Sequence, residues 1–251
     1  MRKNIKLILL LSISLNLFCI LILSTMIFKN VAPSTFKNKV ISVFSQQKSN
    51  TNGYYFERAD QFKTLDITSK DIIFVGDSIT DMGEWSEIFN NPNVKNRGIN
   101  GDNISRVKDR IGNIAKGNPK SIFLMIGTND LSGNPDISSL LKDYEGIVKI
   151  IKDTSPSTKI YIQSVLPVNS TSWKNDSNVA LNNRIEPNER IKLFNLKIKE
   201  IAENENAEYI NLFDKFTDSD GNLDMKYSGE GLHLIGNGYM LWKQAIQQYI
   251  N

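Results

Sequence analysis

Ser78 and His233, the only histidine in the chain, are the side chains best suited to covalent chemistry. A serine hydroxyl is a weak nucleophile until a base takes its proton, and imidazole is the side chain whose ordinary pKa suits that task near neutral pH. Glu230, three residues before the histidine, could orient the imidazole and stabilise its charged form. The three residues together predict nucleophilic catalysis by a serine.

Attack on a carbonyl group also requires hydrogen-bond donors for the oxyanion that forms. The backbone N–H groups of Gly101 and Ser78 and the side-chain amide of Asn129 are the predicted donors, since a glycine lets the backbone approach a substrate closely. Loss of one such donor typically costs about 3–4 kcal/mol of transition-state stabilisation. Asp77 and Asp102 are interpreted as hydrogen-bonding residues behind the site. The alternatives are that Ser78 only caps a helix and that Asn129 only occupies a turn.

Alternating strand and helix patterns, typical of βαβ units, would bring these residues together. In a parallel sheet the carboxyl ends of the strands share one edge, which is where such folds place their ligands. The predicted strands are residues 71–75, 94–96, 121–126, 159–166 and 207–213. The predicted helices are residues 54–62, 80–89, 104–114, 137–155, 188–205 and a last one from about 239 to 250. The loop 168–187, which contains Trp173, is long enough to be functional.

These stretches resemble the SGNH, or GDSL-type, hydrolase family from about residue 71 to residue 249. The resemblance implies that Ser78 is the nucleophile, that Gly101 and Asn129 belong to the oxyanion hole, and that His233 is the base. It further implies a flavodoxin-like three-layer α/β/α sandwich with a five-stranded parallel sheet in the order 2-1-3-4-5. The implied activity is ester hydrolysis through an acyl-enzyme, without a cofactor.

One residue departs from that family's pattern. The family usually has an aspartate three residues before the histidine, where this chain has Glu230. The additional methylene requires a displaced backbone or a different rotamer. Asp224 is the reserve candidate for the third member, and a Ser–His dyad assisted by a backbone carbonyl is a further alternative.

Composition narrows the classes of partner. The formal net charge of +3 gives no reason to expect a nucleic-acid partner. One cysteine and one histidine exclude an intrachain disulfide and a His/Cys metal cluster. We expect no bound metal, and the alternative is a hard-cation site made of carboxylates, for which the sequence has no EF-hand spacing.

The first 30 residues have a different character from the rest. Three basic residues precede residues 7–28, which carry no charge and are long enough to cross a bilayer. We expect a signal anchor at residues 1–30, a polar tether at 31–52 and a hydrolase domain at 53–251 on the extracytoplasmic side. The alternative is a protein secreted after cleavage of the signal.

The expected function is hydrolysis of small-acyl esters, with acetyl as the first candidate and a carbohydrate or another small molecule as the alcohol. One alternative is an O-acyltransferase that uses the same acyl-enzyme, and another is a catalytically silent binding module at the cell surface. The sequence leaves the natural ester and the oligomeric state open.

Overall fold

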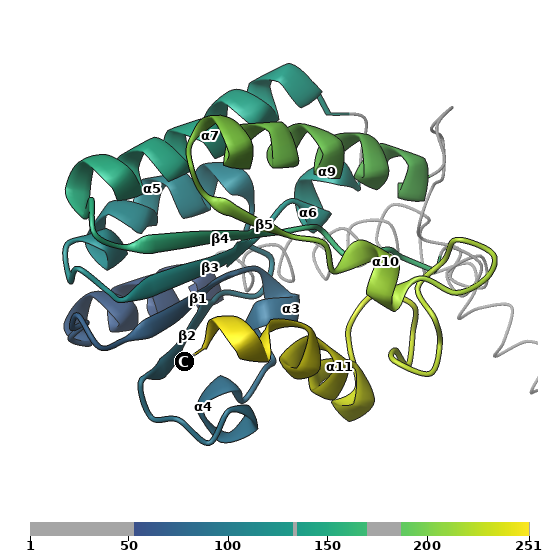
Figure 1. The fold of residues 1–251 in the computed structure, drawn as a ribbon, viewed down its shortest axis with the longest axis horizontal. Coiled ribbons are helices and arrows are strands. Elements are labelled where there is room, and N and C mark those ends of the chain that lie inside the picture. Colours follow the sequence, from purple (N-terminus) through teal and green to yellow (C-terminus); the bar gives the residue numbers. More distant parts are fainter. Residues whose placement is uncertain (1–52, 133–134, 170–186, 251) are drawn as a thin grey trace, which may run out of the picture. The chain divides into compact units, whose positions relative to one another are not determined.

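The computed structural model describes residues 53–132, 135–169 and 187–250. Five parallel strands form one sheet in the order β2-β1-β3-β4-β5, which confirms the predicted topology (Figure 1). The strands are β1 (Ile72–Gly76), β2 (Val94–Gly98), β3 (Ser121–Met125), β4 (Lys159–Gln163) and β5 (Glu208–Ile210). Every residue of β1 and β3 is buried, as expected of strands covered by helices on both faces.

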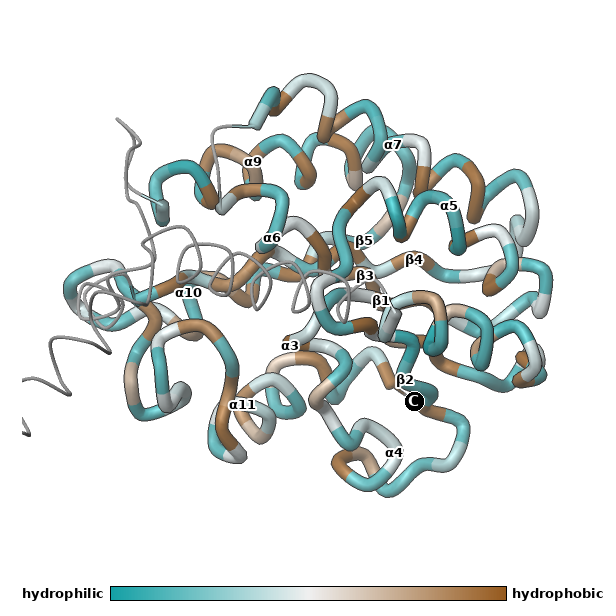
Figure 2. Tube along the Cα trace, turned by 180° about the vertical axis from the view of Figure 1, so that it is seen from behind, coloured by the Kyte–Doolittle hydropathy of each residue, from teal (hydrophilic) through white to brown (hydrophobic). Residues whose placement is uncertain are grey.

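Helices cover the two faces of the sheet and enclose two apolar clusters. One face carries α5 (Ile104–Ala115), α7 (Ile137–Thr154) and α9 (Pro187–Asn204), and the other carries α4 (Trp85–Ile88) and α11 (Gly236–Ile246) (Figure 1). Figure 2 shows brown, apolar residues recurring between hydrophilic ones along α5, α7 and α9, the pattern of helices with one buried face. The remaining helices are short: α3 (Ser78–Asp81), α6 (Thr128–Leu131), α10 (Phe213–Phe216) and the 3₁₀ turn η1 (Gln247–Tyr249).

The helix predicted for residues 80–89 is wrong as a single element. The structure has two one-turn helices, α3 and α4, separated by a break at Gly83. The side-chain amide of Asn96 donates to the carbonyls of Thr80, Asp81 and Gly83 at 2.9–3.1 Å. These carbonyls are therefore engaged by a neighbouring strand, and α3 ends after one turn.

Two strand ends also differ from the prediction. The strand β4, predicted up to residue 166, ends at Gln163. The segment predicted as a strand up to residue 213 leaves the sheet after Ile210, because the Ser164 hydroxyl accepts hydrogen bonds from the N–H groups of Leu212 and Phe213 at the start of α10. The one-turn helix α6, which contains Asn129, was not predicted. Four residues carry too little periodicity to be recognised as a helix.

Residues 53–64 form a helix at the start of the described domain, which confirms the helix predicted for residues 54–62. Tyr55 and Phe62 pack against neighbouring groups, whereas Phe56 is 69% exposed.

Within the described part of the chain, no helix is long and apolar enough to span a membrane. The predicted anchor, the tether and Trp173 lie outside the described residues.

Candidate active site

Ser78 lies at the junction between β1 and α3, at the carboxyl edge of the sheet. Asp77 caps the helix by accepting a hydrogen bond from the Ile79 N–H at 3.0 Å, so that Ser78 becomes the first helical residue. Gly76 leaves no room for a side chain, since a Cβ there would lie 2.2 Å from Thr80 Oγ1 and 2.4 Å from the Met125 carbonyl oxygen. The sharp, tightly packed turn sets the position of the serine.

The structure brings Ser78, His233 and Glu230 into a chain of contacts. Ser78 Oγ lies 3.0 Å from His233 Nε2 across 155 positions of sequence, and His233 Nδ1 lies 3.0 Å from Glu230 Oε1. The same glutamate oxygen also accepts the backbone N–H of His233. This is the order of contacts found in a nucleophile–base–acid triad. The longer side chain of glutamate is thus accommodated by folding back onto its own loop.

Ser228 stabilises the loop that carries Glu230 and His233, and this role is not predicted from the sequence. Its side chain accepts the Gly231 N–H at 2.8 Å and donates to the His233 carbonyl at 2.7 Å. Gly231 has a φ of 91°, a left-handed conformation that favours glycine. Asp224, the reserve candidate for the third member, instead pairs with Lys226 at 2.7 Å. The loop therefore presents Glu230, and not Asp224, to the histidine.

The predicted oxyanion donors lie on two loops that are bonded together. Asp102 N–H donates to the Ile99 carbonyl at 3.0 Å and closes a turn in which Gly101 has a φ of 73°, as glycine has in the third position of a type II turn. Asn129 Nδ2 donates to the Asp102 carbonyl at 2.8 Å, which leaves its second amide hydrogen available. Among the described residues, no backbone hydrogen bond outside the regular elements is donated by Ser78 or Gly101.

Buried and half-buried charged side chains support these loops from inside the domain. Arg110 pairs with the fully buried Asp102 at 2.8 Å and donates to the Gly76 carbonyl at 3.3 Å, so it joins the oxyanion turn to the end of β1. Both oxygens of Asp130 accept the Ile104 N–H at the start of α5. Burial raises the pKa of Asp77 to about 7 and that of Asp130 to about 6, and it also raises the pKa of Asp102 against the opposing effect of Arg110.

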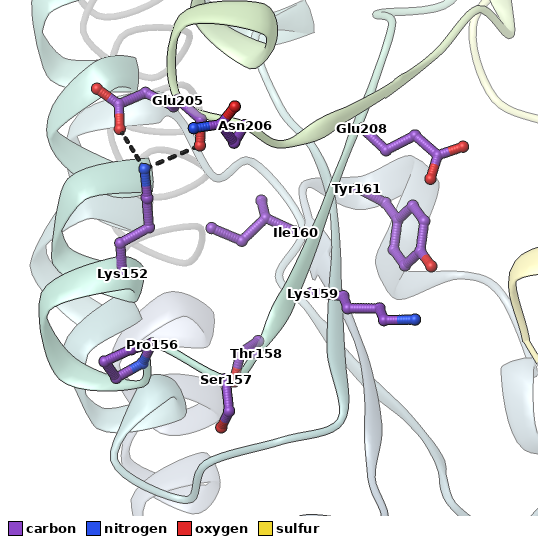
Figure 3. A pocket seen from close by; sticks show the side chains of 10 residues that line it. All are labelled: Lys152, Pro156, Ser157, Thr158, Lys159, Ile160, Tyr161, Glu205, Asn206 and Glu208. Carbon is purple, nitrogen blue, oxygen red and sulfur yellow. Dashed lines mark hydrogen bonds and ion pairs between the residues drawn. The ribbon is translucent and has the colours of Figure 1, made fainter.

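Among the residues that the structure describes, no group of three or more metal-binding side chains occurs, and a large cavity lies away from Ser78. A cavity of about 390 Å³ lies around Lys152, Tyr161 and Glu205 (Figure 3). It adjoins the start of β4, at the edge of the sheet opposite Ser78, and the Lys152 ammonium there is already bonded to Glu205. The cavity therefore does not belong to the Ser78 site.

Comparison with known proteins gives consistent matches. The human platelet-activating factor acetylhydrolase IB subunit alpha2 is 27% identical over 176 residues, which cover 67% of this chain and 71% of that protein. The structure of a putative platelet activating factor from Streptococcus pneumonia has a TM-score of 0.72 at 25% identity and covers 85% of this chain and 99% of that one.

A third similar protein shares the fold at lower identity. An acetylxylan esterase from Geobacillus stearothermophilus has a TM-score of 0.56 at 19% identity, with coverage of 74% of this chain and 95% of that one. The family description that matches residues 74–241 is the GDSL-like Lipase/Acylhydrolase family, and this range contains Ser78, Gly101, Asn129, Glu230 and His233. On the strength of this match, the chain belongs to the GDSL-like lipase/acylhydrolase family.

Proposed function

We propose that this protein hydrolyses small-acyl esters through an acyl-enzyme on Ser78. The observation that carries the proposal is the 3.0 Å separation between Ser78 Oγ and His233 Nε2, within hydrogen-bonding reach for proton transfer. The half-exposed side chain of Glu230 then stabilises the imidazolium that forms. A hydroxyl activated in this way attacks carbonyl carbon, which defines acyl transfer as the reaction class.

The reaction proceeds in two halves. In the first, His233 takes the Ser78 proton as the hydroxyl adds to the ester carbonyl, and the developing oxyanion is stabilised by the donors of Ser78, Gly101 and Asn129. His233 then returns the proton to the departing alcohol and leaves an acyl-serine. In the second half, His233 activates a water that attacks the acyl-serine, and the acid is released with Ser78 regenerated.

We propose acetyl as the acyl group. Support comes from the relatives, because the mammalian protein is named an acetylhydrolase and a fold relative is named an acetylxylan esterase. A carbohydrate is the first candidate for the alcohol. An acyltransferase would use the same acyl-serine, and its hydrolysis rate would be low until an acceptor sugar is added.

We further propose that residues 7–28 anchor the protein in the cell membrane with the catalytic domain on the extracytoplasmic side. The uncharged run and the basic residues before it support this orientation. Fractionation of cells that express the full chain tests it. The proposal requires the protein in the membrane fraction and cleavage of its domain by protease added outside the membrane, whereas a protein found only in the soluble cell extract would contradict it.

Hydrolysis of p-nitrophenyl acetate by the full chain tests the proposed reaction. Ser78→Ala is expected to abolish turnover, and His233→Ala to lower kcat by about 10²–10⁴-fold, the usual contribution of a general base. Ser105→Ala removes an exposed serine of α5 and serves as the matched control, with wild-type turnover expected. Equal rates for wild type and Ser78→Ala would refute the assignment.

A further inference from the structure

Asp81, the last residue of α3, joins three parts of the chain through its carboxylate. Oδ2 accepts the Tyr54 hydroxyl at 2.6 Å and the Asn100 N–H at 3.1 Å, and Oδ1 pairs with Arg58 at 3.3 Å. The Asp81 side chain is only 9% exposed. Tyr54 and Arg58 both belong to the helix of residues 53–64, and Asn100 belongs to the turn that carries Gly101. Asp81 therefore lies between the first helix of the domain and the oxyanion turn.

The position of the Asn100 N–H affects the conformation of the turn from Ile99 to Asp102. Asn100 and Gly101 are its two central residues, and the peptide bond between them carries the Gly101 N–H. Types I and II of this turn differ by a flip of that central peptide, which reverses the direction of its N–H. Because Asp81 holds the residue before the central peptide, it restrains the direction in which the Gly101 N–H points.

A second contact links the same helix to the other side of the turn. The Arg106 guanidinium lies 4.7 Å from the centroid of the Tyr55 ring and donates to the Gly101 carbonyl at 3.5 Å. The Tyr55 hydroxyl donates in turn to the Arg106 carbonyl at 3.4 Å. Adjacent tyrosines of one helix thus contact the groups that hold both central residues of the turn.

We propose that Asp81 is a positioning residue that orients the oxyanion turn by holding the Asn100 N–H, and that Tyr54 and Arg58 on the helix of residues 53–64 fix the Asp81 carboxylate. This inference rests on the proposed esterase function, because it assigns the turn a role in transition-state stabilisation. The helix precedes the range of the family match, residues 74–241, so it is a feature of this chain that the match does not include.

Two substitutions at Asp81 separate positioning from stability in the full-length protein. Asp81→Ala removes both the acceptor for Asn100 and the charge that pairs with Arg58. Asp81→Asn removes the charge, but its amide oxygen still accepts the Asn100 N–H. We expect Asp81→Ala to lower kcat for p-nitrophenyl acetate at least about tenfold, with KM little changed. This loss is smaller than the about 10²–10³-fold typical of removing an oxyanion donor, because the Gly101 N–H is misoriented and not removed. Asp81→Asn should restore most of kcat.

Thermal unfolding supplies the contrast. Both variants lose the ion pair with Arg58, and Asp81→Ala also leaves the Tyr54 hydroxyl and the Asn100 N–H without their acceptor, so its Tm should fall further. Measuring kcat well below both Tm values, where each variant is folded, therefore separates the position of the turn from global stability. Asp60→Asn, at an 80% exposed carboxylate on the same helix, is the control and should keep the wild-type kcat and Tm. Equal kcat for wild type and Asp81→Ala, or an equal loss of kcat in both Asp81 variants, would overturn the inference.

Hydrogen–deuterium exchange reports on the same contact without substrate. The backbone amide hydrogen of Asn100 should exchange faster in Asp81→Ala than in wild type, and at nearly the wild-type rate in Asp81→Asn. Unchanged exchange in Asp81→Ala would overturn the inference. Hydrolysis of p-nitrophenyl acetate by Ser78→Ala tests the proposed function separately. If this variant keeps the wild-type rate, the esterase assignment fails. Exchange at the Asn100 N–H would still decide whether Asp81 holds the turn.

Discussion

The side-chain amide of Asn129 donates a hydrogen bond of 2.8 Å to the backbone carbonyl of Asp102. This bond joins the loop after β3 to the turn after β2, the two loops that carry the proposed oxyanion donors. Asp102 is in turn paired through its carboxylate with Arg110 on α5. The positions of both proposed donors, Gly101 and Asn129, therefore depend on the buried Asp102. The ion pair between Asp102 and Arg110 thus supports the proposed oxyanion hole as well as the fold.

We expect Arg110→Met to destabilise the protein by about 3–5 kcal/mol, because it leaves the Asp102 carboxylate buried without its cation. Urea unfolding measures this as a lower midpoint. The double variant Arg110→Met/Asp102→Asn removes the uncompensated charge and should recover part of the loss. A single variant as stable as wild type would show that Asp102 finds another partner or is protonated without cost.

The pKa of Asp77, raised by burial to about 7, predicts a pH dependence of stability. Between the unfolded pKa near 4 and about 7 the folded state binds more protons than the unfolded state, so the free energy of unfolding should fall as pH rises, by at most about 1.4 kcal/mol per unit from this residue. Asp77→Asn keeps a helix-capping oxygen but cannot ionise, and it should flatten the slope. Urea unfolding at pH 4.5, 5.5 and 6.5, about the range in which the carboxyl titrates, measures it. Parallel slopes for the two proteins would contradict the prediction.

Replacing Glu230 distinguishes a triad from a dyad. Glu230→Gln removes the negative charge that faces His233 Nδ1 and should lower kcat at least about tenfold if the carboxylate stabilises the imidazolium. Asp224→Asn is the matched control, since that carboxylate pairs with Lys226, and it should leave kcat unchanged. A wild-type kcat for Glu230→Gln would support a Ser–His dyad, and a loss in Asp224→Asn alone would reverse the assignment.

The sequence predicts the elements that depend on burial pattern. β1 and β3 are runs of apolar residues, and the three- and four-residue spacing of Ile104, Val107 and Ile111 predicts the buried face of α5, which the structure confirms. The parallel topology follows from the alternation of strands and helices together with the family resemblance. These signals are local, so a single sequence contains them.

Features that depend on contacts between distant residues could not be predicted in this way. Asn96 ends α3 from a neighbouring strand, and Arg110 reaches Asp102 and Gly76 from the side of α5 that faces the site. In the sequence Ser228 has no feature that distinguishes it from other loop serines, and only the structure shows its hydrogen bonds to Gly231 and His233. Polar side chains of this kind have no periodicity, and only the folded arrangement reveals their partners.

Identification of the acylated residue tests the central claim most directly. The full chain is mixed with p-nitrophenyl acetate, quenched in acid during turnover, digested and analysed by mass spectrometry. The account predicts one acetyl group on Ser78 and none in Ser78→Ala. An acetyl group on another residue, or steady turnover by Ser78→Ala, would contradict it.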